Sequence, residues 1–156
     1  MHTLAPTSTR HLRVNISTEC PTQFVDLTPR IVSLVRDSGV QTGFVNIQSL
    51  HTTTAIVLNE HEPLLLDDFA GVFDRLAPED RGYRHDHPFL RTVNLTEDER
   101  VNGHSHCRAL LLPSNVCLNI VDGKMQLGRW QRLFLVELDG PRDRQVSVLV
   151  FGEGTR

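Results

Sequence analysis

Residues 51–60 contain the densest set of side chains that could do chemistry. His51 is followed by three threonines, then by the apolar run 55–58, and finally by Asn59 and Glu60. An imidazole can ligate a metal, hydroxyls can donate to phosphate oxygens, and a carboxylate can titrate or bind a hard cation. The same pattern also suits a plain β-strand with polar ends, because threonine is a good strand residue.

Histidines gather further along the chain. Four of the eight lie between residues 83 and 106, namely His85, His87, His104 and His106. Neutral imidazole is the commonest metal ligand, and a catalytic zinc site needs three protein ligands plus an open water position. No pair has the His-Glu-x-x-His helical spacing, so loop histidines that simply face water remain an alternative.

Oxygen ligands and anion donors accompany the histidines. Magnesium that holds a pyrophosphate typically uses one or two carboxylates, a role open to Glu60 and Asp68. Glu60 could instead orient an imidazole, or place its charge ahead of the helix that follows it. Thr52 and Thr53 could donate to phosphate at a strand end. Arg142 could fork onto phosphate or form a surface ion pair.

The composition indicates one soluble globular domain. The chain has 156 residues, of which 39% are hydrophobic and 22% charged, and its formal net charge is −3. That charge gives no general attraction to nucleic acid or to anionic membranes. We see no signal peptide and no apolar run near the ~20 residues of a membrane helix, so we expect a cytoplasmic protein. The three cysteines form no CxxC motif, and Cys107 and Cys117 are expected to be buried.

Periodicity predicts an α+β fold with a single domain over residues 11–156. Residues 1–10 are rich in Thr, Ser and Pro and are expected to be disordered. Two main helices are predicted, one beginning at Pro29 and one at Pro63. We expect a β-rich, sandwich-like sheet beside them. Its predicted strands are 12–17, 44–50, 116–121, 127–138 and 146–151.

Two segments after the second helix have less regular patterns. Residues 77–103 form a long polar stretch, and a connection of that length is usually functional or mobile. A short helix over about 105–112 is favoured after it. In the strand beyond, Trp130 and Phe134 share one face and are assigned to the core. Gln131, on the other face, could reach a ligand or a neighbouring subunit.

A set of short motifs occurs in one order along the chain. The motifs are His51-Thr52-Thr53, Asn59-Glu60, Asp68, Tyr83-Arg84-His85, Asn102 with Ser105-His106, Asp122-Gly123, Gly128-Arg129-Trp130-Gln131 and Glu137-Leu138-Asp139-Gly140-Pro141-Arg142. Each motif alone is weak. Their combined order resembles the YjbQ family over about residues 24–153.

The YjbQ resemblance implies a site and an assembly. Members look like trimers with the site near a subunit boundary. The resemblance favours a divalent metal, Mg or Zn, held by His51, His85 and His106. It leaves His87 and His104 as surface residues, and it assigns catalysis to Glu60 and Asp68. It assigns substrate binding to Thr52, Thr53, Asn59, Asn102, Gln131 and Arg142.

Three functions are compatible with these residues. Some YjbQ proteins are described as secondary thiamine-phosphate synthases, which implies an enzyme that joins a pyrimidine methyl diphosphate to a thiazole phosphate and releases pyrophosphate. The leaving diphosphate would be stabilised by a metal and by donors such as Thr52, Thr53 and Arg142. A metal-dependent hydrolase could use metal-bound water with Glu60 as general base. A non-enzymatic oligomer could simply hold a metal or a metabolite. The expected partners are a small phosphorylated metabolite and further copies of the chain in a homotrimer.

Overall fold

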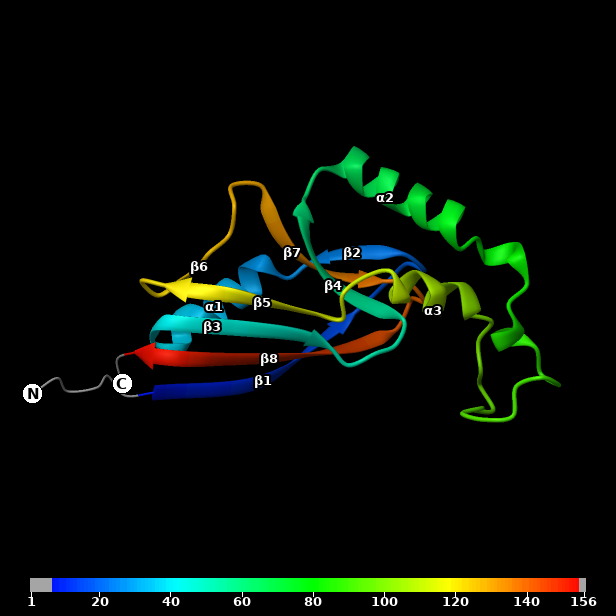
Figure 1. Ribbon diagram of the computed structural model, residues 1–156, viewed down its shortest axis with the longest axis horizontal. Coiled ribbons are helices and arrows are strands. Elements are labelled where there is room, and N and C mark those ends of the chain that lie inside the picture. The colour runs from blue at the N-terminus through cyan, green and yellow to red at the C-terminus, as the bar shows by residue number, and fades with distance from the viewer. Residues whose placement is uncertain (1–6, 155–156) are drawn as a thin grey trace, which may run out of the picture.

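The computed structural model describes residues 7–154, which form one unit of antiparallel sheets and helices (Figure 1). The predicted α+β fold is confirmed. Residues 1–6 of the predicted disordered segment lie outside the described range. Residues 7–10 correct that prediction, because they belong to strand β1 (Thr7–Ser17) and pair with β8 (Asp143–Gly154). Within the described range, no helix is both long and apolar enough to cross a membrane.

The larger sheet has the strand order β1-β8-β3-β5-β6, and every neighbouring pair is antiparallel. Asp122 and Gly123 have φ angles of 51° and 71°, the left-handed values that a two-residue hairpin turn needs. This turn joins β5 (Asn115–Val121) to β6 (Lys124–Met125), the two shortest strands of the sheet. The remaining strand is β3 (Val40–Ser49).

The smaller sheet has the antiparallel order β2-β7-β4. Its strands are β2 (Gln23–Asp26), β4 (Thr54–Glu60) and β7 (Gln131–Glu137). Both faces of β7 are covered, since Leu133 belongs to one apolar cluster and Phe134 to another. The sequence of a strand that is buried on both faces is a continuous apolar run rather than an alternation of apolar and polar residues.

The described residues contain three α-helices, which are α1 (Thr28–Ser38), α2 (Pro63–Leu76) and α3 (Gly103–Leu110). The first two confirm the predicted main helices. Pro29 lies in the first turn of α1, and Gly39 ends it with a φ of 73°. Glu62 caps α2, because its carboxylate accepts from the backbone N–H groups of Leu64 and Leu65. The predicted long connection runs from α2 to α3 and contains two short 3-10 turns, Glu79–Arg81 and Arg84–Asp86.

Two apolar clusters stabilise the fold. The main cluster joins both sheets to α1, with Ile31 and Val35 of the helix packed against residues such as Val45. The second lies on the other face of β7, where Phe73 of α2 and Phe134 each pack against Phe24. Burial of such side chains contributes about 1.5–3 kcal/mol each.

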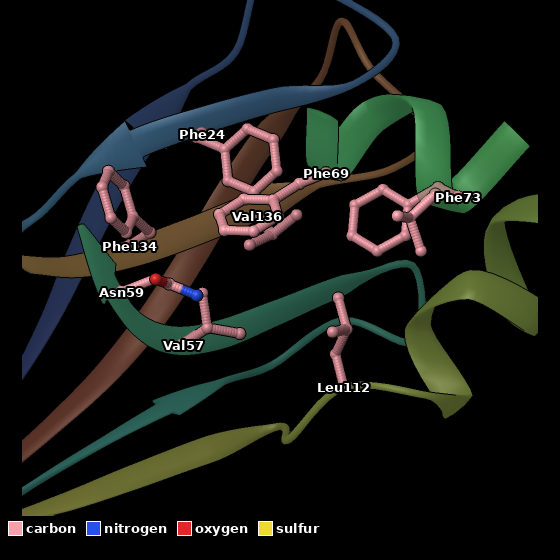
Figure 2. A pocket seen from close by; sticks show the side chains of 9 residues that line it. Phe24, Val57, Asn59, Phe69, Phe73, Leu112, Phe134 and Val136 are labelled. Atoms are coloured by element: carbon pink, nitrogen blue, oxygen red, sulfur yellow. The ribbon is translucent and has the colours of Figure 1, made fainter. Parts of the chain in front are cut away.

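An apolar cavity of about 150 Å³ lies beside the second cluster (Figure 2). Four phenylalanines from β2, α2 and β7 line it, namely Phe24, Phe69, Phe73 and Phe134. Asn59 is the one polar residue among its lining side chains. Phe73 alone is buried within α2, so this helix leaves much of its apolar surface uncovered in a single chain.

Three side chains correct the predictions about the core. Trp130 is 62% exposed, with the Arg129 guanidinium 4.8 Å from its ring centroid. The predicted strand 127–138 begins only at Gln131. Trp130 therefore lies before the strand, and the alternation of strand side chains does not direct its ring toward the core. Cys107 and Cys117 are exposed rather than buried.

Phe134 should be a principal determinant of stability. It is a fully buried member of the second cluster and lines the apolar cavity, so Phe134→Ala should lower the free energy of unfolding by about 3–5 kcal/mol. Phe89→Ala is the matched control, because Phe89 is 88% exposed and its loss should change stability by less than about 0.5 kcal/mol. Urea denaturation followed by circular dichroism measures both, and equal midpoints would contradict the placement of Phe134.

Candidate functional site

A polar cavity of about 540 Å³ lies where β3 and β7 end and β8 begins. Its walls come from the β3–β4 turn, the connection between α2 and α3, the start of α3 and the β7–β8 turn. These segments meet at the end of the sheets remote from the first residues of β1 and the last residues of β8 (Figure 1). The volume falls within the range of small-molecule sites.

Most of the predicted site residues line this one cavity. All three predicted metal ligands do so, namely His51, His85 and His106. Four predicted substrate-binding residues do so as well, namely Thr52, Thr53, Asn102 and Arg142. The fold therefore joins segments that lie far apart in the sequence.

The other predicted site residues lie elsewhere. Glu60 ends β4 and pairs with Gln131, and the rise of ~3.3 Å per strand residue places this pair about 20 Å from Thr54 at the cavity end. Asn59 lines the apolar cavity instead, and Asp68 is exposed on α2. A role for these four residues at the histidines would therefore require a neighbouring chain.

His51 ties the β3–β4 turn to β8. Its Nε2 accepts a hydrogen bond from the backbone N–H of Gln145 at 2.8 Å. A backbone amide can only donate, so Nε2 carries the lone pair and Nδ1 carries the proton of the neutral ring. Ser49 supports the turn, because its hydroxyl bonds to the backbone N–H of His51 and to the hydroxyl of Thr54.

A close backbone approach brings His85 and His106 together. The carboxylate of Asp86 accepts from the backbone N–H of Gly103 at 2.9 Å, at the start of α3. A Cβ on Gly103 would lie 2.4 Å from the Cβ of Tyr83, so glycine is required at this contact. The two imidazole rings then lie with their centroids 4.6 Å apart.

The imidazoles of one chain do not form a complete metal site. Arg91 Nη1 lies 3.2 Å from His85 Nε2, and arginine can only donate, so this lone pair is already used, like that of His51. Among residues 7–154, no group of three or more His, Cys, Asp or Glu side chains is arranged to hold a metal. A three-ligand site therefore does not fit the described side chains, and metal binding stays a prediction.

The cavity lowers the pKa of two of its histidines. Burial and the charge of Arg144 lower the pKa of His51, although Glu137 opposes them. Burial and the neighbouring His85 lower the pKa of His106 below its usual range. Both rings are consequently neutral at pH 7 and become cationic only in acid.

Four arginines line the cavity, and sequence analysis identified only Arg142. The guanidinium of Arg142 pairs with Asp139 at 2.8 Å, and that of Arg91 pairs with Glu99 at 2.6 Å. Arg100 donates instead to the carbonyl oxygens of Asp139 and Pro141. Arg100 forms no ion pair among the described residues, and neither does Asp98, the third carboxylate that lines the cavity.

Arg144 forms a buried ion pair behind the cavity wall. Its Nε and Nη2 donate to the two carboxylate oxygens of Glu137, both at 2.6 Å. Nη2 also donates to the hydroxyl of Thr53 at 3.0 Å, which leaves the Thr53 proton available for a ligand. One sequence signal could have revealed Arg144, since it occupies the buried face of β8 in alternation with Val146 and Val148.

Burial raises the pKa of Glu137, but its partners more than offset this effect. Hydrogen bonds from Arg144 and from the backbone N–H of Asp139, together with the arginine charge, bring the pKa below its ordinary value. The hydroxyl of Thr18 donates to the same carboxylate. Glu137 is therefore ionised and fully satisfied at neutral pH.

His104 corrects a further prediction, because it is buried rather than on the surface. Its Nε2 lies 3.1 Å from the hydroxyl of Ser105, which in turn donates to the carbonyl of Leu138. His87 is exposed, as predicted. Neither histidine lines the polar cavity.

Comparison with known proteins identifies the family. The model of the family described as UPF0047 protein YjbQ-like matches residues 12–153. This chain belongs to the UPF0047 family. A UPF0047 protein of Methanothermobacter thermautotrophicus is 35% identical over 131 residues, which cover 84% of each chain. A UPF0047 protein of Archaeoglobus fulgidus is 34% identical over 137 residues, or 88% of this chain and 98% of the relative.

Comparison with solved structures shows that the fold of this chain is similar as well. A Sulfolobus solfataricus protein, described as YbjQ-like and of unknown function, has a TM-score of 0.83 at 32% identity. That comparison covers 95% of this chain and 100% of the other. The polar cavity lies wholly within the UPF0047 match, because its lining residues run from Leu50 to Arg144.

The buried ion pair predicts how Glu137→Gln changes stability. The substitution leaves Arg144 buried without its counter-charge, so the free energy of unfolding should fall by about 3–5 kcal/mol at pH 7. Because the pKa of Glu137 is lowered on folding, this stability is present above the unfolded carboxyl pKa and is lost as pH falls through the folded value.

Urea unfolding at pH 7 and at pH 3 measures the difference between wild type and Glu137→Gln. The difference should shrink at pH 3, below the ordinary glutamate pKa, because the unfolded wild-type chain then takes up a proton that the folded chain binds less readily. Glu153→Gln is the control, since Glu153 is exposed on β8. A pH-independent difference would contradict the ion pair as its cause.

The lowered histidine pKa values predict the pH dependence of anion binding. Sulfate keeps its charge in mild acid, whereas His51 and His106 gain protons only below the ordinary imidazole pKa, because their pKa values are lowered. Sulfate affinity, measured by calorimetry at a series of pH values, should therefore rise as the pH is lowered from 7.5 and these two rings become cationic. A divalent metal would behave oppositely, because imidazole must be neutral to bind it.

The control for the sulfate titration is a double variant, His51→Gln with His106→Gln. Its sulfate affinity should show little dependence on pH. If the sulfate affinity of the wild type decreases as the pH is lowered, an anion site at these histidines is contradicted.

Proposed function

We propose that the polar cavity binds a phosphorylated metabolite. The observation that supports this most is the convergence of Arg100, Arg142 and the hydroxyl of Thr53 with neutral imidazoles in one cavity. Guanidinium groups and hydroxyls are donors that suit phosphate oxygens. The volume of about 540 Å³ is sufficient for a small ligand.

We further propose a transferase of the thiamine-phosphate synthase type, as the YjbQ resemblance implies. The ring nitrogen of a thiazole phosphate would attack the methylene carbon of a pyrimidine methyl diphosphate. The carbon–oxygen bond would break, and the diphosphate would leave with the electron pair. Negative charge grows on that diphosphate, so donors aimed at it lower the barrier.

Two hydrogen-bond donors of the cavity are held in position by neighbouring side chains before a ligand binds. Arg142 is held by Asp139, and the Thr53 oxygen is held by Arg144, so neither has to be ordered when the ligand binds. Prearranged donors cost little reorganisation at the moment of reaction. The predicted divalent ion, Mg or Zn, would neutralise diphosphate charge, but residues 7–154 of one chain offer it no complete ligand set.

A homotrimer would explain the remaining predicted residues. Glu60 and Asp68 lie outside the cavity of their own chain, and a neighbouring subunit could supply them. Leu64 and Leu76 are exposed apolar residues on α2, and Trp130 is exposed as well. Large exposed apolar patches commonly mark protein–protein contacts. Such an assembly of a phosphometabolite enzyme would operate in the cytoplasm.

A second candidate is a non-enzymatic metabolite-binding oligomer. One observation favours it, because two of the three carboxylates that line the cavity, Asp139 and Glu99, are engaged by arginines. A single chain therefore offers several hydrogen-bond donors to an anion. The two paired carboxylates, however, are not free to act as general bases. The hydrolase hypothesis has less support, because Glu60 lies about 20 Å from the cavity end along β4.

Product formation tests the transferase proposal. With both precursors and Mg²⁺, the wild type should form thiamine phosphate weakly, and Arg142→Met should lower turnover by roughly 10²-fold. Glu60→Gln and Asp68→Asn should abolish it, whereas the control Asp67→Asn changes an exposed neighbour on α2 and should not. Binding of both precursors without any product would favour the non-enzymatic candidate.

Light scattering tests the assembly. At micromolar concentration the mass should be three times the 17.6 kDa of one chain. Leu76→Lys places a charge on the exposed apolar surface of α2 and should shift the mass downward, whereas Asp67→Lys on the same helix should not. A wild-type mass of one chain would exclude the trimer.

A further inference from the structure

We propose that the apolar cavity is a second ligand site, which takes a small neutral molecule with one aromatic ring and one hydrogen-bond acceptor. The cavity lies between α2 and the smaller sheet, and none of its lining residues lines the polar cavity (Figure 2). Its ligand differs in chemistry from a phosphorylated metabolite. The second site therefore does not depend on the proposed function.

The cavity has the size of a single-ring ligand. Its volume is about 150 Å³. Native interiors keep few voids larger than a water molecule, so a space of this size is unusual in a packed fold. An engineered apolar cavity of about 150 Å³ in another protein stays dry and binds benzene. Val72 lines the cavity and is 37% exposed, which gives a ligand a way in from solvent.

The walls of the cavity are aromatic and are held in place by ring contacts. The centroid of the Phe24 ring lies between 5.9 and 6.3 Å from those of the other three phenylalanines. Rings attract one another at such distances, in tilted, offset and edge-on arrangements. Phe73 and Phe134 are also buried, so these walls are already ordered before a ligand enters. A further aromatic ring can make the same contacts, which favours an aromatic ligand over an aliphatic one.

Asn59 supplies the one polar group of the lining. Its Oδ1 accepts from the backbone N–H of Glu60 at 2.9 Å, and this bond fixes the orientation of the amide, because a backbone amide can only donate. Figure 2 shows the amide nitrogen on the side that faces the other lining side chains. That nitrogen makes no hydrogen bond to the described residues and can only donate. The ligand group that meets it is therefore an acceptor, such as a carbonyl oxygen.

The charge of the ligand follows from the same lining. None of the described side chains that line the cavity is charged. Arg132 lies opposite Asn59 on the neighbouring strand, but its guanidinium pairs with Asp26 at 2.6 Å. An anionic group in the cavity would lose its hydration without gaining a free cation, which is costly. The ligand is consequently neutral, and a phosphate ester is excluded.

Calorimetry with three probes tests the second site. The probes are acetophenone, ethylbenzene, in which a methylene replaces the carbonyl, and benzoate. The wild type should bind the first two and should not bind benzoate measurably. Asn59→Leu should lower the ratio of the acetophenone affinity to the ethylbenzene affinity by about three- to tenfold, because only the ketone loses a hydrogen bond. A merely structural role of Asn59 would change both affinities equally and leave the ratio as it was.

A second variant locates the site. Val72→Phe places a ring in the cavity and should abolish the binding of both aromatics. Val32→Phe on α1 is the matched control, because Val32 is 47% exposed and lies outside the cavity, so binding should not change. Circular dichroism checks that each variant folds, and the wild-type affinities test the site even where a variant does not.

Three results would overturn the second site or its ligand class. One is a wild type that binds neither aromatic; if Leu76→Lys then binds them, a second copy of the chain is the occupant of the cavity. Another is benzoate bound as tightly as acetophenone. The third is an unchanged affinity ratio in folded Asn59→Leu, or binding that persists in folded Val72→Phe.

Discussion

The buried pair of Glu137 and Arg144 is the interaction on which the cavity depends. Glu137 belongs to the smaller sheet and Arg144 to the larger one, and their side chains are 0% and 4% exposed. The same carboxylate accepts from Thr18 after β1, and the same guanidinium donates to Thr53 before β4. Four segments thus share one network, and a buried network of this kind is stable only when every charge keeps its partner.

This network explains why a polar cavity can sit at the end of an otherwise apolar fold. With Arg144 neutralised by Glu137, the cavity draws its directional donors from residues such as Arg100 and Thr53. The apolar cavity beside α2 offers no such groups apart from Asn59 (Figure 2). The two cavities therefore suit different chemistry, and the guanidinium and hydroxyl donors occur in the polar one.

Several features were predictable because they depend on neighbours in the sequence. Pro29 and Gly39 mark the ends of α1, and Asp122-Gly123 makes the predicted hairpin turn. The long polar stretch after α2 was correctly expected to be a connection. Trp130 was assigned wrongly, because two-residue alternation cannot reveal where a strand begins. Arg144 was missed, because a charged residue on an apolar face is explained only by its distant partner.

The sequence by itself determined the elements, the family resemblance and the set of reactive residue types, since periodicity, turn chemistry and motif order are properties of the linear chain. Only the tertiary structure decided which of those residues meet. It brought His51, His85 and His106 to one cavity and left Glu60 at the far end of β4. It also decided which atoms stay free, because the lone pair of an imidazole or an amide is assigned by donors and acceptors that fold against it from elsewhere.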